Sequence, residues 1–480
     1  MMSTIVNEKR MTFKELEQKV FDHACEYGRN IIKSILETHD VELMESRDKG
    51  ALRNKGFRQT TVKTVMGSVG YDRRIYETKD DEGHKAWVYL LDQEMQMEKI
   101  GMISSNLAEK IADVVSENSY HSTAEIISST SGQAISHGGA WNLVQKLGER
   151  ISEEETARVS EMDAGCERGE REIKLLFEEM DGVWLKMQGE GHKKVPKREI
   201  KVAVMYEGWV EDGKDNSSLS NRRVLAGMEK SREFHDKREA QIRNVYNADE
   251  IVYRILNGDG GSWVEDPYDP ERVFQLDPFH IESEIKKKLP EKKAASEAKE
   301  LFHVGEYDGL LGFIDTYATS VATSDEEDKR SKKALELLSY LGNNREGLVP
   351  WQKQRDDYPE APEGIVYKNM GVMENQNFTI ITKRMKGGRR RWSENGANHM
   401  AKLLYTKENK ELIETIGRYA HGLVYARPVE EILKTLSAAK APKKDGKGSP
   451  YLDNTKHYMP ILDAAQTEAR KTFRKIFACA

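Results

Sequence analysis

Hydrophobic positions along the chain follow two different periods, and they predict helical segments on either side of a set of strands. In residues 11–46 apolar side chains recur at three- and four-residue steps, which predicts a long helix. Residues 60–78 instead alternate, with β-branched side chains around Gly67 and Gly70, and this pattern predicts a hairpin. Helical periodicity returns over residues 103–149.

Part of that helical region has the pattern of two short helices joined by a turn. Residues 119–148 predict a helix around 124–129, a Ser/Gly turn at 130–132 and a second helix from about 136. This is similar to a helix-turn-helix, whose second helix would enter a major groove. Ordinary packing of two short helices stays open as the alternative. The candidate DNA-contacting residues are Ser136, His137 and Asn142.

Strand patterns begin after a highly charged segment, residues 150–172, which predicts a linker or a connecting helix. A helix is predicted at residues 232–247. Strands are predicted at residues 174–180, 183–188, 199–206, 252–257 and 273–276. Three antiparallel strands, a helix and further strands form the order expected of a ribonuclease-H-like mixed sheet. Residues 281–356 are helical and very charged, which predicts a helical insertion in that domain.

The expected fold is therefore an α/β catalytic core with a ribonuclease-H-like mixed sheet and a helical insertion. A mainly helical N-terminal DNA-binding region precedes it. The expected domains are an N-terminal region with the candidate helix-turn-helix, a charged linker, a catalytic domain with its insertion at about 281–356, and a C-terminal helical tail; their bounds are 1–150, 151–172, 173–405 and 406–480.

Composition narrows the possible classes of protein. The chain has 480 residues, enough for two or three domains, and a net charge of −6, which argues against a globally basic nucleic-acid coat. Three scattered cysteines form no CxxC pair, so neither a zinc ribbon nor a disulfide framework is predicted. No apolar run approaches the roughly 18 residues of a membrane span, and the N-terminal residues lack a signal-peptide core. We expect a cytoplasmic protein without membrane contact.

Three acidic residues stand in contexts that suit metal-bound carboxylates. Asp181 follows an apolar run in LLFEEMDGVWLKM, and Asp259 lies among glycines in RILNGDGGSWV. Glu179 is the local rival of Asp181 because it shares the same strand face, and a plain turn residue is the alternative. The glycines around Asp259 would let a phosphate or metal approach closely, although no GxxxxGK[ST] pattern is present. Glu374 is the third acid.

Neighbouring polar residues extend this set. Asp277 and His280 in FQLDPFH either support the site by hydrogen bonding or form an ordinary Asp-His cap. Glu374 is expected to share one helix face with Asn377, Ile381 and Arg384, and a solvated polar face is the alternative.

A basic cluster follows this helix. Its residues are expected to hold phosphates, unless they form only a solvated face. They are Lys383, Arg384, Arg389, Arg390 and Arg391.

Together the MDG, GDG, DPFH and MENQN motifs resemble the DDE transposases of bacterial insertion sequences of the ISLre type, which are related to the Mutator-like transposases. The resemblance covers roughly residues 50–450. It implies that Asp181, Asp259 and Glu374 bind two Mg²⁺ ions, or Mn²⁺, on a retroviral-integrase fold. Two such ions hold the attacking and leaving oxygens of a phosphodiester.

The resemblance also implies partners: double-stranded DNA, both element ends and target, and further copies of the chain, since two ends must be brought together. The alternatives are a nuclease of the same fold that does not join DNA, and a catalytically inactive DNA-binding protein.

Overall fold

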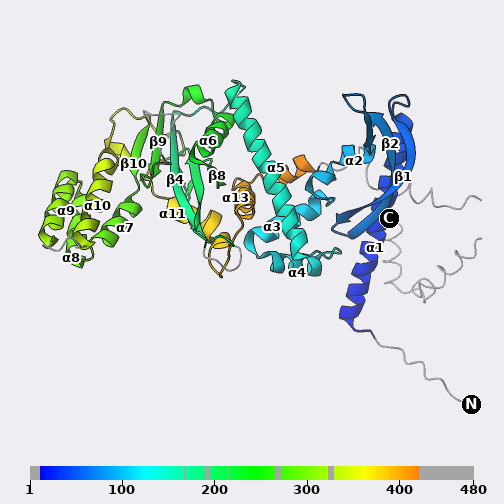
Figure 1. The fold of residues 1–480 in the computed structure, drawn as a ribbon, viewed down its shortest axis with the longest axis horizontal. Helices are drawn as coiled ribbons and strands as arrows, with labels where there is room; N and C mark the ends of the chain where they lie inside the picture. The colour runs from blue at the N-terminus through cyan, green and yellow to red at the C-terminus, as the bar shows by residue number, and fades with distance from the viewer. Residues whose placement is uncertain are drawn as a thin grey trace, which may run out of the picture. The chain divides into compact units, whose positions relative to one another are not determined.

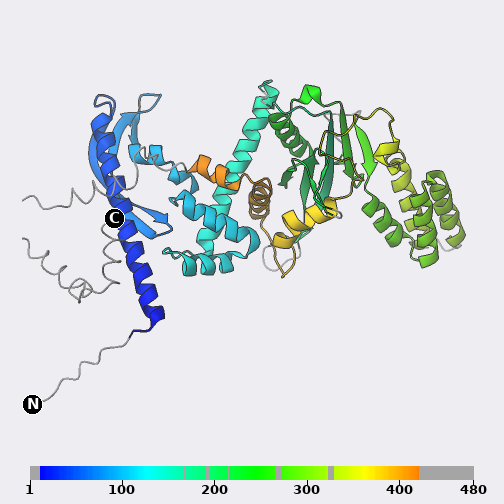
Figure 2. The ribbon, with the colours of Figure 1, turned by 180° about the vertical axis from the view of Figure 1, so that it is seen from behind.

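The chain forms two compact units, each with its own sheet (Figures 1 and 2). The structure is a computed structural model that describes residues 11–166, 169–189, 195–213, 216–264, 272–322 and 329–420. Of the described residues, 11–96 belong to the first unit, and the second unit is Met97–Ala420. The predicted C-terminal tail beyond residue 420 lies outside the described residues.

The first unit packs one long helix on a small antiparallel sheet. Its elements are α1 (Phe13–Ser46), β1 (Arg53–Thr64), β2 (Gly67–Lys79), β3 (Lys85–Val88) and α2 (Leu90–Met95). A capping box between Thr12 and Glu15 begins α1, and the buried Asp40 of α1 pairs with Arg74 of β2 at 2.5 Å. The predicted helix and hairpin are confirmed, but the turn precedes Gly67, which opens β2.

A five-stranded mixed sheet is the centre of the second unit. Its order across the sheet is β10 (Val273–Leu276), β9 (Tyr253–Gly258), β4 (Leu175–Leu185), β5 (Arg198–Tyr206) and β8 (Arg223–Gly227). Strands β10, β9 and β4 are parallel, whereas β4, β5 and β8 are antiparallel. The protein is thus mixed α/β, with this sheet and a helical N-terminal region. A two-stranded ribbon accompanies the sheet, formed by β6 (Trp209–Glu211) and β7 (Ser217–Leu219).

The prediction of two short strands at residues 174–180 and 183–188 was wrong, because β4 runs unbroken through Gly182. Gly182 is therefore no turn residue. It pairs with Lys201, and a Cβ atom at this position would lie 1.9 Å from Glu199 Oε1. The third antiparallel strand is β8, which was not predicted.

Helices cover the sheet and join it to the N-terminal helical region. They are α3 (Ser105–Glu117), α4 (Tyr120–Thr130), α5 (His137–Asp163), α6 (Ser231–Val245), α13 (Glu394–Glu408) and α14 (Leu412–Tyr419). The segment predicted as a linker or a connecting helix is largely helix, because α5 continues to Asp163, with Ile151 and Met162 buried. At Gly148 a Cβ atom would lie 2.3 Å from His399 Cβ of α13, so α5 and α13 pack closely there. Residues 97–163 therefore belong to the same unit as the sheet.

The predicted helical insertion is present beside the β10 edge of the sheet (Figure 1). It consists of α7 (Pro278–Lys288), α8 (Lys292–Val304), α9 (Tyr307–Val321) and α10 (Lys329–Asn343). These helices share an apolar core that includes Ile281, Leu310 and Leu337. Among the described helices, none is long and apolar enough to span a membrane.

A buried ionic cluster connects α5, α6 and α13. Lys402 of α13 is fully buried and pairs with Glu155 at 2.8 Å and with Glu229 at 2.6 Å. Lys237 of α6 pairs with the same two carboxylates at 3.1 and 2.9 Å. Burial alone would raise the pKa of Glu229, but Lys402 and Lys237 outweigh it and lower that pKa to about 2. The cluster thus fixes the helical region against the helices that flank the sheet.

Candidate functional site

Two of the three predicted acids meet where adjacent parallel strands carry them to one place. Asp181 lies within β4, and Asp259 directly follows β9, the parallel neighbour of β4. The Asp259 carboxylate accepts a hydrogen bond from Gly261 N at 2.9 Å, and its carbonyl accepts one from Tyr340 of the insertion at 2.8 Å. The loop that carries Asp259 is therefore held by its own glycine and by α10.

The surroundings of Asp181 disfavour the charged form of its carboxyl group. It is 8% exposed, and burial raises its pKa. The nearby charges of Asp259 and Asp277 raise it further, while His280 and Gly182 N lower it. A buried carboxylate beside a second carboxylate is stabilised by a bound cation, since the cation relieves both the desolvation and the repulsion.

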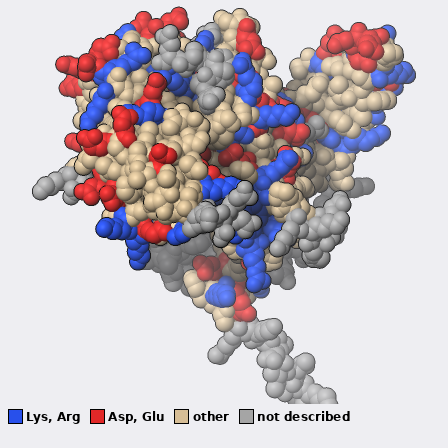
Figure 3. Space-filling model, turned by 60° about the vertical axis from the view of Figure 1, so that its left-hand side comes forward, with Lys and Arg blue, Asp and Glu red and all other residues tan. Residues whose placement is uncertain are grey.

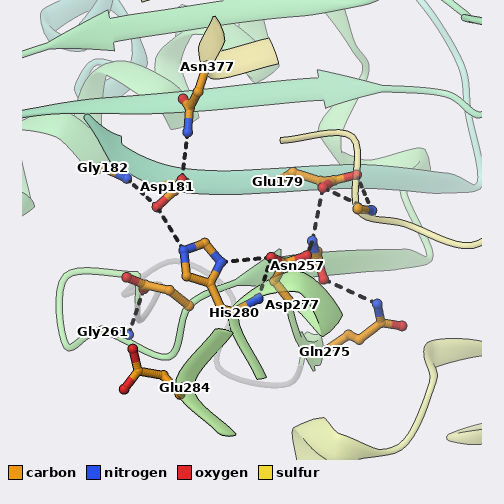
Figure 4. Close-up of polar contacts among 12 residues, drawn as sticks. Glu179, Asp181, Gly182, Asn257, Gly261, Gln275, Asp277, His280, Glu284 and Asn377 are labelled. Atoms are coloured by element: carbon orange, nitrogen blue, oxygen red, sulfur yellow. Dashed lines mark hydrogen bonds and ion pairs between the residues drawn. The ribbon is translucent and has the colours of Figure 1, made fainter. Parts of the chain in front are cut away.

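Asp277 and His280 form both contacts that the sequence left as alternatives. Asp277 caps α7, accepting from His280 N at 3.3 Å, and it also contacts the His280 ring at Nδ1 at 2.7 Å. The other ring nitrogen, Nε2, lies 3.7 Å from Asp181 Oδ1 (Figure 4). The imidazole therefore lies between two carboxylates, with Asp277 fixing its orientation.

We expect His280 to titrate above an ordinary histidine, because the Asp277 hydrogen bond raises its pKa and Asp181 and Asp259 raise it further against the effect of burial. Asp277→Asn should lower that pKa while preserving the helix, since asparagine is also a good N-cap. A pH titration of the ring resonances by NMR would measure both values, with His280→Gln assigning the signal. An unchanged pKa in Asp277→Asn would contradict this assignment of the cause.

A polar ladder continues from the site across the sheet (Figure 4). Glu179 is fully buried and accepts hydrogen bonds from Tyr206 at 2.7 Å and Asn257 at 2.9 Å. Its carboxylate also accepts from the backbone of Gly371 and Val372, directly before α11. Glu179, the alternative to Asp181, thus uses its carboxylate oxygens to hold the loop before α11.

The helix predicted to carry the third acid presents a different residue to Asp181. In α11 (Met373–Asn377), Asn377 is buried and its Nδ2 donates to Asp181 Oδ2 at 2.6 Å. Glu374, one turn earlier, is exposed. A turn of π-helix, Phe378–Thr382, separates α11 from α12 (Lys383–Met385) and interrupts the 3.6-residue period. Asn377, Ile381 and Arg384 are buried whereas Glu374 is exposed, so the predicted common face of all four residues was wrong.

The oxygen groups at Asp181 fit a hard divalent cation. Asp181 and Asp259 supply carboxylates, and Asn377 Oδ1 is buried without a hydrogen-bond partner in the described part of the chain. Carboxylate and amide oxygens are the ligands that Mg²⁺ accepts. Across the described residues, however, no three His, Cys, Asp or Glu side chains converge closely enough to hold a metal ion. The structure thus brings Asp181 and Asp259 together but leaves the predicted third acid, Glu374, exposed and outside any such set.

Two further acids near the site were missed by sequence reasoning. Burial raises the pKa of Glu199 on β5, and Asp259 and Asp181 raise it further, so Glu199 lies near both. Glu284, one turn after His280 on α7, and Asp259 both raise the pKa of Tyr340. Helix periodicity from His280 could have indicated Glu284. Strand alternation gives no such signal for Glu199, because Glu199 pairs with Trp184 whereas Asp181 pairs with Val202.

The predicted basic cluster divides into structural and exposed members. Arg384 is buried, donates to Val115 O at 2.7 Å and lies over the Trp392 ring. Arg390 donates to three backbone carbonyls at the end of α12, and Lys383 pairs with Glu117 at 2.7 Å. Only the two remaining members are exposed without such a role; these are Arg389 and Arg391.

Basic and acidic side chains are interspersed over the face drawn in Figure 3, so phosphate binding would depend on a few residues. We predict that changing Arg389 and Arg391 together to alanine weakens DNA binding and reduces the slope of log K against log[salt] by roughly 2. Fluorescence anisotropy at several salt concentrations measures this. Lys292→Ala/Lys293→Ala, a pair of exposed lysines on α8, should leave the slope unchanged. Equal slopes in both double variants would contradict the prediction.

The candidate helix-turn-helix residues lie where α5 begins. The two predicted helices are α4 and α5, and Ser136 is the N-cap of α5, accepting from Gly139 N at 3.1 Å. His137 stacks on His121 of α4 with ring centroids 6.4 Å apart. Asn142 is exposed. The helices are thus confirmed, and their binding to DNA stays a prediction.

Fold and site together define a mixed α/β protein in which two adjacent parallel strands bring together a buried aspartate, Asp181, and a half-buried one, Asp259. Residues 6–416 match the family described as uncharacterised protein family UPF0236. The chain belongs to this family.

The match with curated relatives extends over most of this chain and most of each relative. The UPF0236 protein in vanSb 3'region of Streptococcus gallolyticus is 25% identical over 418 residues, which are 85% of each chain. UPF0236 protein TTE2489 of Caldanaerobacter subterraneus subsp. tengcongensis is 22% identical over 414 residues, 85% of this chain and 81% of the relative. A third, UPF0236 protein TTE0610/TTE0881/TTE1053/TTE2432 of the same strain, is 22% identical over 85% of this chain and 80% of its own length.

Proposed function

We propose that this protein is a DDE-type DNA transposase, which cleaves the ends of an insertion sequence and joins them to target DNA. One observation carries the proposal: Asp181 and Asp259 meet at adjacent parallel strands, opposite Asn377 of the helix that also bears Glu374. Hard oxygen ligands on two strands and one helix are what phosphodiester cleavage with two metal ions requires.

The topology supports a ribonuclease-H-like core. Three antiparallel strands, β4, β5 and β8, are followed by α6 and by two strands parallel to β4. The helical insertion lies between the second acid and Glu374, as the resemblance to the ISLre-type transposases implies. The name of one relative joins four designations from a single strain, which suits a sequence that occurs in several copies.

In this proposal the residues have distinct roles. Two bound Mg²⁺ or Mn²⁺ ions would stabilise the charge on the attacking and leaving oxygens. Asp181, Asp259 and Glu374 would bind these ions, and Asn377 and His280 would orient the Asp181 carboxylate that they contact. Water and then a DNA 3′-hydroxyl act as nucleophiles, so no covalent enzyme intermediate forms. Because two element ends react together, a homo-oligomer on double-stranded DNA is expected.

The test uses plasmid DNA carrying the sequence that flanks the protein's own gene, with Mg²⁺. Wild type should give cleavage at the element ends and joined products, whereas Glu374→Gln should give neither. Glu363→Gln, which changes an equally exposed glutamate outside the helix, is the matched control and should behave as wild type. Cleavage without joining would favour a nuclease, and full activity in Glu374→Gln would remove Glu374 from the site.

A further inference from the structure

A polar cavity of about 640 Å³ opens beside α11, the helix that reaches Asp181. Asn375 and Gln376 of α11 line it, whereas the next residue, Asn377, donates to Asp181. Successive residues of a helix project about 100° apart, so one helix serves both places. The rest of the wall comes from the β6–β7 ribbon, the start of β8 and the end of α13.

The arginines of this cavity are already neutralised. Arg222 donates to the Gln376 side-chain oxygen and pairs with Glu408. Arg223 pairs with Glu411 at 2.6 Å. A free phosphate would have to displace these partners, so the interior of the cavity is not an anion site. A ligand without charge fits it better.

Several hydrogen-bonding groups in the cavity are still available. Asn375 is exposed, and its side-chain amide makes no hydrogen bond to the described part of the chain, nor does the Ser218 hydroxyl. Gln376 uses its oxygen on Arg222, which leaves its NH₂ group to donate. Amides present a donor and an acceptor side by side, which matches the edge of a nucleobase.

The rim differs from the interior. Lys410 follows α13, is exposed, and has a left-handed backbone with φ of 62°. It lines the cavity and forms no ion pair with the described residues, so its ammonium group is available to an anion there. The cavity has a neutral, hydrogen-bonding interior and a cation, Lys410, in its wall. This combination suits a nucleotide whose base lies inside the cavity and whose phosphate contacts Lys410.

We propose that this cavity receives an unpaired nucleotide of the DNA strand whose phosphodiester lies at Asp181 and Asp259. Asn375 and Gln376 bind the base edge, and Lys410 binds the phosphate. The base must be unpaired because a base that is stacked within a duplex cannot enter a cavity. This inference rests on the proposed function, since α11 links the cavity to the carboxylate pair.

The test measures binding without catalysis. The full chain is titrated in EDTA with a duplex that ends in a three-nucleotide overhang carrying 2-aminopurine, and with the same duplex made blunt. Wild type should prefer the overhang. Asn375→Ala should reduce that preference about 5- to 10-fold and leave blunt-duplex affinity unchanged, as for the loss of one or two hydrogen bonds. Asn395→Ala, an exposed asparagine on α13, should match wild type.

Equal loss of affinity for both duplexes in Asn375→Ala, or no loss for either, would overturn the inference. Because Asn375 is exposed, misfolding is not expected to obscure the result. If wild type cleaves and joins plasmid DNA but shows no overhang preference, the cavity assignment fails alone. If the selective loss occurs while no cleavage is found with Mg²⁺, the cavity assignment stands and the transposase proposal fails.

Discussion

Asp259→Asn should reduce Mg²⁺-dependent DNA cleavage by about 10³-fold while DNA affinity changes less than about threefold. The substitution removes one of the carboxylates that would hold the Mg²⁺ ions, and these ions would stabilise the negative charge that develops on the phosphoryl oxygens; such interactions are among the largest in catalysis. The fold should survive, because the asparagine side-chain oxygen can still accept the hydrogen bond that Asp259 receives from Gly261 N. Single-turnover cleavage of a labelled element end measures the rate, and anisotropy measures binding.

The matched control is Asp249→Asn, which changes an exposed aspartate before β9 and should leave both quantities unchanged. If Asp259→Asn lost DNA binding to the same degree as cleavage, the residue would have a structural role instead. If it retained wild-type cleavage, the carboxylate pair would not be the reaction centre.

The parts of the site that could be predicted are those fixed by local sequence. Asp259 follows its strand directly, and the DPFH segment places Asp277 at an N-cap with His280 three residues later, whatever the rest of the fold. The strands β5, β9 and β10 were predicted to within about two residues, because their apolar runs are short and bounded by polar segments.

Other parts depend on contacts between distant segments. Gly182 has the sequence context of a turn, yet β4 continues through it and pairs there with Lys201 of β5. The residue of α11 that meets Asp181 depends on the hydrogen bonds of Glu179 to the loop before the helix. A 3.6-residue period cannot anticipate either effect.

The N-terminal helical region illustrates the same limit. Its charged end, residues 150–172, was predicted as a linker or a connecting helix, because Glu and Arg are usually solvated, and residues 150–163 do continue α5. In the structure Glu155 is buried in α5, where it pairs with lysines from α6 and α13 and accepts from the Tyr405 hydroxyl at 2.6 Å. Buried ion pairs of this kind leave no hydrophobic periodicity in the sequence. They can therefore be identified only when the packing of the helices is known.

Lys402→Met should lower the free energy of unfolding by about 3–5 kcal/mol, because removing one partner of a buried ionic cluster leaves its charges uncompensated. Lys402 is fully buried between Glu155 and Glu229, and without it these two carboxylates share Lys237 alone. Urea denaturation followed by tryptophan fluorescence measures the change. Lys407→Met on the same helix should cost less than about 1 kcal/mol, since Lys407 pairs with the exposed Asp113.

A second substitution separates uncompensated charge from lost packing. Glu229→Gln removes one of the two carboxylates that Lys402 neutralises, so adding it to Lys402→Met should restore about 1 kcal/mol or more, whereas alone it should destabilise. If the two changes were additive, the cost of Lys402→Met would come from its packed side chain and not from its charge. Recovery in the double variant would instead establish that α5 is fixed to the α6 and α13 helices by charge balance. The helical region that contains α5 would then unfold together with the sheet that carries Asp181 and Asp259. Lys402 of α13 joins α5 to the helices that flank this sheet.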